Sequence, residues 1–349
     1  MGDKVIKKEE LPNFLRVLKK TYEVLVPVKE DGFSSFKPSR DEETIDLSFT
    51  NTRLSPRSFL LPQSERMFEF TLDEKSEDAR ILKEAPRDYP PKVVVGIRPC
   101  DAMALRLVDV SFDNPEFKDP WWVKRRGSMT LVGLGCSQPC STCFCTSVNC
   151  GPFNEDGLDV LLFDLGDSFL AKALTEKGAK LLKVGGVEKD ADVGLKKKGD
   201  ELKTEAEKRI SNHAPTDRLR EKDVKDLFDA PFWDDVAFAC INCGTCTFLC
   251  PTCWCFDIQD EVTKKEGDRI RNWDSCMFPL FTLHASGHNP RAEKVQRVRQ
   301  RFMHKLKYYV DKHGNGVACV GCGRCVRYCP VNIDIREVFR LMNELGKSA

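Results

Sequence analysis

Two runs of cysteines in the C-terminal third of the 349-residue chain have a spacing that suits iron–sulfur chemistry. In each run, pairs of residues separate three cysteines, and a fourth follows after three more residues, directly before a proline. The runs are Cys240, Cys243, Cys246 and Cys250, and Cys319, Cys322, Cys325 and Cys329. A 4Fe–4S cluster needs four thiolates around a compact cube, and one such turn supplies three. The spacing therefore predicts two 4Fe–4S clusters.

The fourth ligand of each cluster is expected to come from the other run. In two-cluster ferredoxins the cysteine before the proline binds the other cluster. The expected ligand sets are therefore Cys240, Cys243, Cys246 and Cys329 for one cluster, and Cys319, Cys322, Cys325 and Cys250 for the other. Glycines at 244, 321 and 323 are expected to let the backbone approach the clusters. Zinc ribbons also use paired cysteines, but zinc protein is colourless and cluster protein is brown.

A second concentration of cysteines lies in the N-terminal half: Cys136, Cys140, Cys143, Cys145 and Cys150. The one-residue spacing of Cys143 and Cys145 does not suit four ligands from one segment. Cys100 follows the expected strand 93–97, and Cys136 follows the expected strand 130–134. If these strands are neighbours, their ends bring both thiols together. This predicts a third 4Fe–4S cluster on Cys100, Cys136, Cys143 and Cys145; a zinc site or reduced core thiols are the alternatives.

Three further cysteines, Cys253, Cys255 and Cys276, have no assigned ligand role. They could approach a cluster or a partner's cofactor, although buried structural thiols are the more common case. Seventeen cysteines without a secretory segment favour metal ligation over disulfides, because cytoplasmic thiols are kept reduced.

The elements expected to position these residues give an α+β fold. Apolar spacing predicts a helix over 9–22, strands over 24–28, 93–97, 130–134 and 159–165, a short helix capped by Ser55, and a helix over 168–177. We expect a mixed α/β domain over residues 1–190 and a charged helical connector over 191–231. Residues 232–349 are expected to form an all-α helical ferredoxin domain with two clusters, because residues 291–309 have helical periodicity.

Composition excludes several classes of function. The formal net charge of +1 does not favour a nucleic acid as partner. No apolar run is long enough to span a membrane, which predicts a cytoplasmic protein without membrane insertion. The sequence has no dinucleotide or phosphate-binding loop and no nucleophile–base pair. Hydride chemistry must therefore be supplied by a partner.

Six segments, in this order, resemble a known family: Ile97–Asp101, Gly135–Cys145, Cys250–Cys255, Asp274–Cys276, Gly287–Arg291 and Cys319–Cys325. Together they are similar to the beta subunit of cytoplasmic NiFe sulfhydrogenases and to the A subunit of anaerobic sulfite reductase. The resemblance covers nearly the whole chain. The charged stretch near 190–215 and the extra Cys140 and Cys150 are not family features.

The resemblance implies an iron–sulfur electron-transfer subunit of an anaerobic multi-subunit oxidoreductase. Its partners would be a flavin subunit that handles NAD(P)H and a catalytic subunit of hydrogenase, sulfite reductase or heterodisulfide-reductase type. In that interpretation the chain itself is not catalytic. The alternative is an enzyme whose N-terminal cluster itself reduces a sulfur compound or a disulfide. A metal-bound scaffold without a redox role is a third hypothesis.

Overall fold

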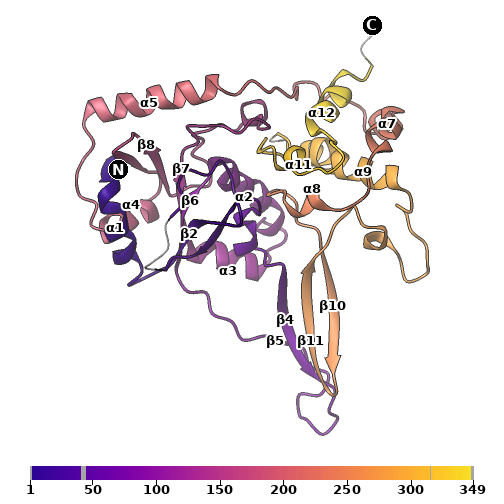
Figure 1. Cartoon of the computed structure of the whole chain (residues 1–349). Coiled ribbons are helices and arrows are strands. Elements are labelled where there is room, and N and C mark those ends of the chain that lie inside the picture. Colours follow the sequence, from indigo (N-terminus) through magenta and orange to yellow (C-terminus); the bar gives the residue numbers. More distant parts are fainter. Residues whose placement is uncertain (1, 41–44, 315, 347–349) are drawn as a thin grey trace.

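The computed structural model describes residues 2–40, 45–314 and 316–346 of the chain. In this part, the larger of two sheets has seven strands (Figure 1). Their spatial order is β1 (Lys4–Lys7), β9 (Ser168–Ala173), β8 (Val160–Asp164), β7 (Met129–Leu134), β6 (Lys92–Ile97), β2 (Glu23–Glu30) and β3 (Phe33–Pro38). The central strands β2, β6, β7 and β8 are parallel, and the outer pairs are antiparallel.

Helices cover both faces of this sheet. On one face, Val93 and Val95 of β6 share a core with α1 (Leu11–Leu18) and α4 (Glu176–Val184). On the other face, Val94 shares a core with α2 (Pro99–Phe112) and α3 (Pro120–Ser128). Successive residues of a strand point to opposite faces, so the run of valines is buried on both sides. The expected mixed α/β architecture of the N-terminal part is confirmed.

One expected helix is wrong. Residues 168–173 form strand β9, and the helix begins only at Glu176. Gly166 has a φ of 106°, which permits the tight turn after β8, and β9 then pairs antiparallel with β8, as in the pair Phe163 and Leu170. Pairing with a neighbouring strand overrides the local preference of this short segment.

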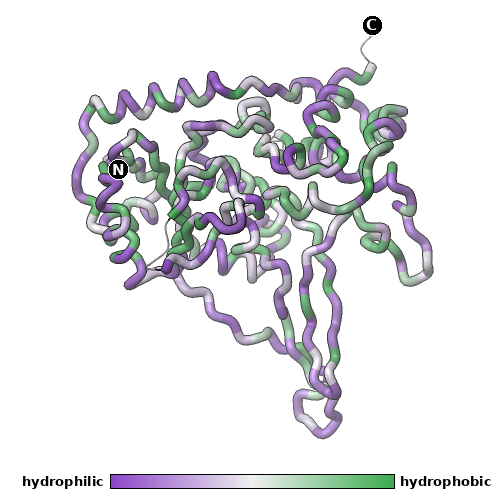
Figure 2. The backbone as a smooth tube through the Cα atoms, in the orientation of Figure 1, coloured by the Kyte–Doolittle hydropathy of each residue, from purple (hydrophilic) through white to green (hydrophobic). Residues whose placement is uncertain are grey.

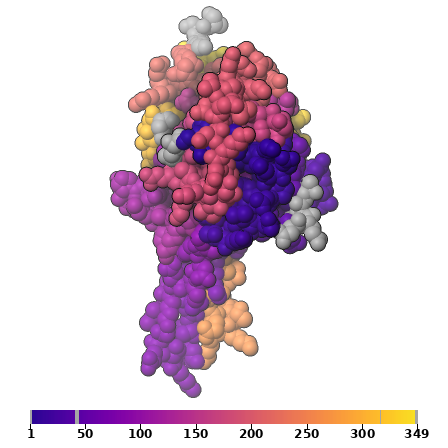
Figure 3. Space-filling model, turned by 90° about the vertical axis from the view of Figure 1, so that its left-hand side faces the viewer, coloured from indigo at the N-terminus to yellow at the C-terminus, as the bar shows by residue number. Residues whose placement is uncertain are grey.

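The second sheet forms an arm that projects from the body, as Figures 1 and 3 show. Its antiparallel order is β10 (Phe256–Thr263), β11 (Glu266–Trp273), β4 (Ser64–Thr71) and β5 (Lys83–Glu84). The all-α description of residues 232–349 is therefore not confirmed. Lys264 adopts a φ of 61° in the turn of the β10–β11 hairpin, and the hairpin is completed by β4 from the N-terminal half. Pairing across such a distance leaves no local signal.

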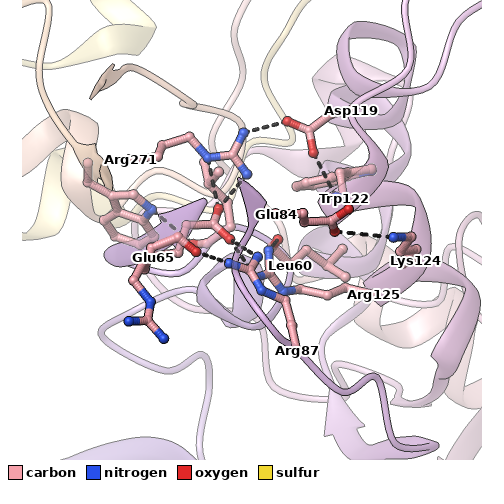
Figure 4. A network of polar contacts seen from close by, with 12 residues as sticks. Leu60, Glu65, Glu84, Arg87, Asp119, Trp122, Lys124, Arg125 and Arg271 are labelled. Atoms are coloured by element: carbon pink, nitrogen blue, oxygen red, sulfur yellow. Dashed lines mark hydrogen bonds and ion pairs between the residues drawn. The ribbon is translucent and has the colours of Figure 1, made fainter. Parts of the chain in front are cut away.

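A buried ionic network holds the base of the arm (Figure 4). The carboxylate of Glu65 on β4 accepts hydrogen bonds from Arg271 on β11 at 2.8 Å, from Arg125 at 2.5 Å and from Arg87 at 2.8 Å. Arg271 also pairs with Asp119, the N-cap residue of α3. The side chains of Glu65 and Arg271 are 4% and 2% exposed. The network ties both halves of the arm to the body.

The remaining elements are short helices around the cysteine runs. A hydrophilic helix, α5 (Val193–Lys208), carries the chain across the body towards them (Figure 2). The short helices around the cysteine runs are α6 (Val224–Phe228), α7 (Phe232–Phe238), α8 (Thr245–Phe248), α9 (Lys294–Met303), α10 (Tyr309–His313), α11 (Arg324–Arg327) and α12 (Ile335–Glu344). A π-helical turn, η5 (His304–Tyr308), joins α9 to α10, and 3-10 turns lie at Lys8–Glu10, Pro56–Phe59, Cys145–Val148 and Pro279–Thr282. Across the described ranges, no helix has the length and apolar character needed to cross a membrane.

Candidate metal centres

The cysteines line four neighbouring cavities, which we call cavities 1 to 4. Cavity 1 is lined by Cys240, Cys243, Cys246, Cys325 and Cys329. Cavity 2 is lined by Cys250, Cys319, Cys322 and Cys325. Cavity 3 is lined by Cys100, Cys136, Cys140, Cys143, Cys145 and Cys322. Cavity 4 is lined by Cys253, Cys255 and Cys276. All seventeen cysteines lie in the described ranges, and Cys150 alone lines none of these cavities.

Cavity 1 brings together the four residues predicted as one ligand set, including Cys329 from the second run. Backbone N–H groups point at two of its thiols: Asn242 donates to Cys240 Sγ at 3.4 Å, and Ile333 donates to Cys329 Sγ at 3.2 Å. Gly244 precedes α8 with a φ of 73°. The turn therefore directs amide dipoles at the sulfur atoms, which is where a bound cluster accepts hydrogen bonds.

Cavity 2 brings together the other predicted set, including Cys250 from the first run. The N–H of Gly321 donates to Cys319 Sγ at 3.4 Å. Burial raises the pKa of Cys325 to about 12. Free thiols in this position would be protonated at neutral pH, so a metal has to displace these protons when it binds. Cys325 lies in the linings of both cavities 1 and 2.

Cavity 3 lies at the carboxyl ends of β6 and β7. The two strands are parallel neighbours. This is the condition under which Cys100 and Cys136 were expected to lie close together. Arg98, between β6 and Cys100, donates to the carbonyl oxygens of Leu134 at 3.2 Å and Gly135 at 2.8 Å. All four predicted ligands line this cavity. Cys140, which was not expected to be a ligand, also lines this cavity.

Cavities 2 and 3 are joined by close backbone packing. Gly321 and Gly323 have φ values of 62° and 73°, and a Cβ on Gly321 would lie 2.6 Å from the Cα of Cys145. Phe144 N donates to Gly321 O at 2.8 Å. The glycines therefore let the second cysteine run approach the N-terminal cysteine segment, a role in addition to the expected approach to a cluster. Cys322 lines both cavities.

A buried ion pair fixes the same junction. Arg324 donates to both carboxylate oxygens of Asp101, at 2.6 and 2.8 Å, and to the carbonyl oxygen of Thr52 at 2.8 Å. The side chains of Arg324 and Asp101 are 0% and 1% exposed. Because Asp101 follows Cys100 and Arg324 precedes Cys325, this bidentate pair holds the two cysteine regions in register.

Buried cations surround the thiols, and sequence reasoning missed them. Arg301 and Lys305 are 4% and 3% exposed, and both line cavities 2 and 4. Burial alone would lower the pKa of Lys305, but the negative charge of nearby Cys250 and Cys253 outweighs it and raises that pKa. Their spacing in the sequence could have indicated this arrangement. Residues four apart share one helix face, as do Arg297, Arg301 and Lys305.

The residues present fit anionic clusters. The Nε atoms of Arg98 and Arg301 are buried and have no hydrogen-bond partner among the described residues. An unpaired buried cation is costly, and a cluster held by four thiolates supplies the missing negative charge. Within the described ranges, no three or more His, Cys, Asp or Glu side chains converge to hold a single metal ion. The thiols line cavities instead.

The fold and these centres define an iron–sulfur protein. Residues 239–333 match a family model described as a 4Fe-4S dicluster domain. Over 346 residues the chain is 31% identical to sulfhydrogenase 2 subunit beta of Pyrococcus furiosus (strain ATCC 43587 / DSM 3638 / JCM 8422 / Vc1), covering 96% of this chain and 97% of that protein. The chain therefore belongs to the sulfhydrogenase beta-subunit family, as its ordered motifs predicted. No solved structure matches it.

Proposed function

We propose that this chain relays single electrons between a flavin subunit that handles NAD(P)H and the catalytic subunit of an anaerobic oxidoreductase. The observation that carries this proposal is the continuity of cavities 3, 2 and 1. Cys322 is shared by the linings of cavities 3 and 2, and Cys325 by those of cavities 2 and 1. Adjacent centres in a row are what a relay requires.

The proposed ligands are the three sets expected from the sequence. Cavity 1 would use Cys240, Cys243, Cys246 and Cys329; cavity 2 would use Cys319, Cys322, Cys325 and Cys250; cavity 3 would use Cys100, Cys136, Cys143 and Cys145. A bound 4Fe–4S cluster supplies a one-electron redox centre in each cavity. Cys140 also lines cavity 3, but it is not one of the four proposed ligands.

The chain's own side chains set the environment of these centres. The buried cations Arg98, Arg301 and Lys305 stabilise added negative charge, and backbone N–H groups at Cys240, Cys319 and Cys329 do the same. Apolar side chains such as Phe302 and Ile335 line cavity 1 and limit its contact with water. These are the levers by which a protein tunes a cluster potential without changing its ligands.

Cavity 1 is the proposed point of contact with a partner subunit. Cys243 is exposed, and the apolar Ile241, which lines the same cavity, is 62% exposed. Phe238, the last residue of α7, is 82% exposed. Exposed apolar residues beside a redox centre suit a protein interface in which electrons enter or leave.

The test is reduction of the anaerobically purified complex by NAD(P)H, followed by EPR spectroscopy. Clusters of this chain should be reduced reversibly when the flavin subunit is bound and should stay oxidised when it is removed. Cys143→Ser should remove about four iron per chain, by cluster stoichiometry. Unchanged iron and unchanged spectra in Cys143→Ser would exclude the cluster in cavity 3.

Two other outcomes would contradict the relay. If the isolated chain with an artificial electron donor turned over sulfite, polysulfide or a disulfide, the catalytic alternative would replace it. If the bound metal showed no reversible reduction, a structural scaffold would be the better description.

A further inference from the structure

Cavity 4 gathers the three cysteines that the ferredoxin-type runs leave unused. Its position follows from the β10–β11 hairpin. Phe256 pairs with Trp273 at the open end of the hairpin, so Cys255 and Cys276, just outside the two strands, meet there. Asp274 N donates to Cys255 O at 3.0 Å, and the thiols of Cys255 and Cys276 are in hydrogen-bond contact. Cys253 joins them from the turn after Pro251.

The site is a cavity of about 300 Å³ and not a packed thiol core. Besides the three thiols, its lining includes Trp254, His304 and Phe281, and the cations Arg291, Arg301 and Lys305. Buried structural cysteines behave as small apolar residues and fill space. Thiols that instead border an opening rimmed by cations are placed for a ligand of negative charge.

The charge around cavity 4 is unbalanced. Arg57, Arg301 and Lys305 are buried, and among the described residues no carboxylate lies within ion-pair distance of any of them. The Nε atoms of Arg57 and Arg301 are buried without a hydrogen-bond partner in the described part of the chain. Clusters in cavities 1 and 2 would both face Arg301, and a cluster in cavity 2 would face Lys305. Arg57 lines neither of these cavities, and Cys253 is the thiol whose charge affects it most. A second anionic group in cavity 4 would balance the remainder.

Cavity 4 is also next to cavity 2. Thr252, Arg301 and Lys305 line both, and Lys305 Nζ donates to Thr252 Oγ1 at 2.8 Å. The thiols of Cys250 and Cys253 are in contact across this boundary. Cys250 belongs to the ligand set of cavity 2, so cavity 4 has three cysteines of its own.

We propose that cavity 4 binds an additional 4Fe–4S cluster through Cys253, Cys255 and Cys276, with its fourth iron facing the open cavity. A cluster with three cysteine ligands leaves one iron for a small exogenous ligand. The electron path then branches at cavity 2, towards cavity 1 and towards cavity 4. This inference goes beyond the proposed relay of three centres and rests on it only for the cluster in cavity 2.

The experiment is iron, sulfide and zinc analysis of the anaerobically purified complex, per copy of this chain, with EPR of the reduced protein. Cys276→Ser should lower the iron content by about four, by cluster stoichiometry, and should remove one EPR signal while the others remain. Cys150→Ser is the matched control, because Cys150 is a cysteine outside all four cavities, and its iron content should equal that of the wild type.

The outcomes separate this inference from the relay. Unchanged iron in Cys276→Ser, or loss of about one zinc in place of iron, would overturn the cluster in cavity 4. Unchanged iron in Cys143→Ser would count only against cavity 3. If Cys276→Ser failed to assemble, the full-length wild-type chain separated from its partner subunits would still decide: only about sixteen iron per chain accommodates four clusters, whereas about twelve with a Cys143-dependent signal would overturn the proposal, by cluster stoichiometry.

Discussion

At the scale of single residues, the chain places buried cations where thiolates gather. Arg324 and Asp101 form an internally neutral buried pair, which lies between the cysteine segments of cavities 2 and 3. The other cations described above, Arg98, Arg301 and Lys305, have no carboxylate in ion-pair contact within the described ranges. Their charge balance depends on what the cysteines bind.

Asp101→Asn should destabilise the junction between cavities 2 and 3. The substitution leaves the Arg324 guanidinium buried without its counter-ion, and breaking a buried pair in this way costs about 3–5 kcal/mol. Visible cluster absorbance should therefore be lost at a lower temperature than in the wild type. The control is Glu155→Gln, which removes a pair with Lys172 whose side chains are 45% and 41% exposed. Equal thermal stability of Asp101→Asn and the control would contradict the role of this pair.

Lys305→Met should lower a reduction potential. A buried positive charge stabilises an added electron, so its removal makes reduction less favourable. A change of about 1.4 kcal/mol corresponds to about 60 mV for a one-electron couple. An EPR-monitored redox titration measures the shift. Lys312→Met, at an exposed position of α10, should leave the potentials unchanged; an unchanged or higher potential in Lys305→Met would refute this account of Lys305.

At the scale of elements, the arm depends on contacts between segments far apart in the sequence. Strands β4 and β11 are joined both by the backbone ladder and by the carboxylate of Glu65. Burial on its own would raise the pKa of Glu65, but the hydrogen bond from Arg125 and the charges of Arg271 and Arg125 lower it below its ordinary value of 4.5. The network is thus formed with Glu65 ionised.

Glu65→Gln should loosen the arm at neutral pH. Loss of the central carboxylate leaves three arginines facing a neutral group, and removal of one partner from a buried pair costs about 3–5 kcal/mol. Faster limited proteolysis and faster hydrogen exchange of β4 and β11 would report this. Asp260→Asn is the control in the same hairpin, since its pair with Arg269 lies at the surface.

The same network predicts a pH dependence. Because the folded-state pKa of Glu65 is lowered, its contribution to stability is present above pH 4.5 and is lost as the pH falls through the lower, folded-state pKa. Wild-type arm protection should therefore fall in acid, whereas Glu65→Gln should show a smaller change. If the protection of the arm fell equally with pH in both proteins, Glu65 would not be the group responsible.

At the scale of the whole molecule, the two halves of the chain are interleaved. The hairpin between the cysteine runs pairs with an N-terminal strand, and the N-terminal cysteine segment packs on the second run. The domain limits expected at residues 190 and 231 stay a prediction. The interleaving places the cavities beside one another, and the exposed Ile241 lines cavity 1.

Ile241→Asp should weaken binding of the partner subunit without loss of cluster iron. Ile241 is 62% exposed beside Cys240 and Cys243, and a charge there opposes burial in an interface. We expect a loss of at least about 1 kcal/mol in binding, or roughly fivefold in Kd. Titration of the isolated partner measures the affinity, and iron content with EPR serves as the internal check. An unaltered affinity would show that the partner does not bind at Ile241. The control is Val262→Asp at the tip of the arm, which should leave the affinity unchanged.

The sequence by itself determined what depends on local spacing. Three thiols in one tight turn converge because of the backbone alone, so the dicluster character of the cysteine runs could be predicted. The exchange of their fourth ligands stays a prediction. The buried strands β6 and β7 were equally clear, because continuous apolar runs mark strands covered on both faces. The proximity of Cys100 and Cys136 could be predicted from those strands, because each cysteine follows the end of one of them.

Only the tertiary structure decided what depends on pairing between distant segments. Strand β9 and the β10–β11 hairpin exist because neighbouring strands satisfy their backbone groups, which a local pattern does not record. The meeting of Cys253, Cys255 and Cys276 depends on the register of that hairpin. The burial of Arg301 and Lys305 depends on which helix face packs inward. Local spacing marks candidate ligands in a sequence, but charge balance and cavities arise only when the chain is folded.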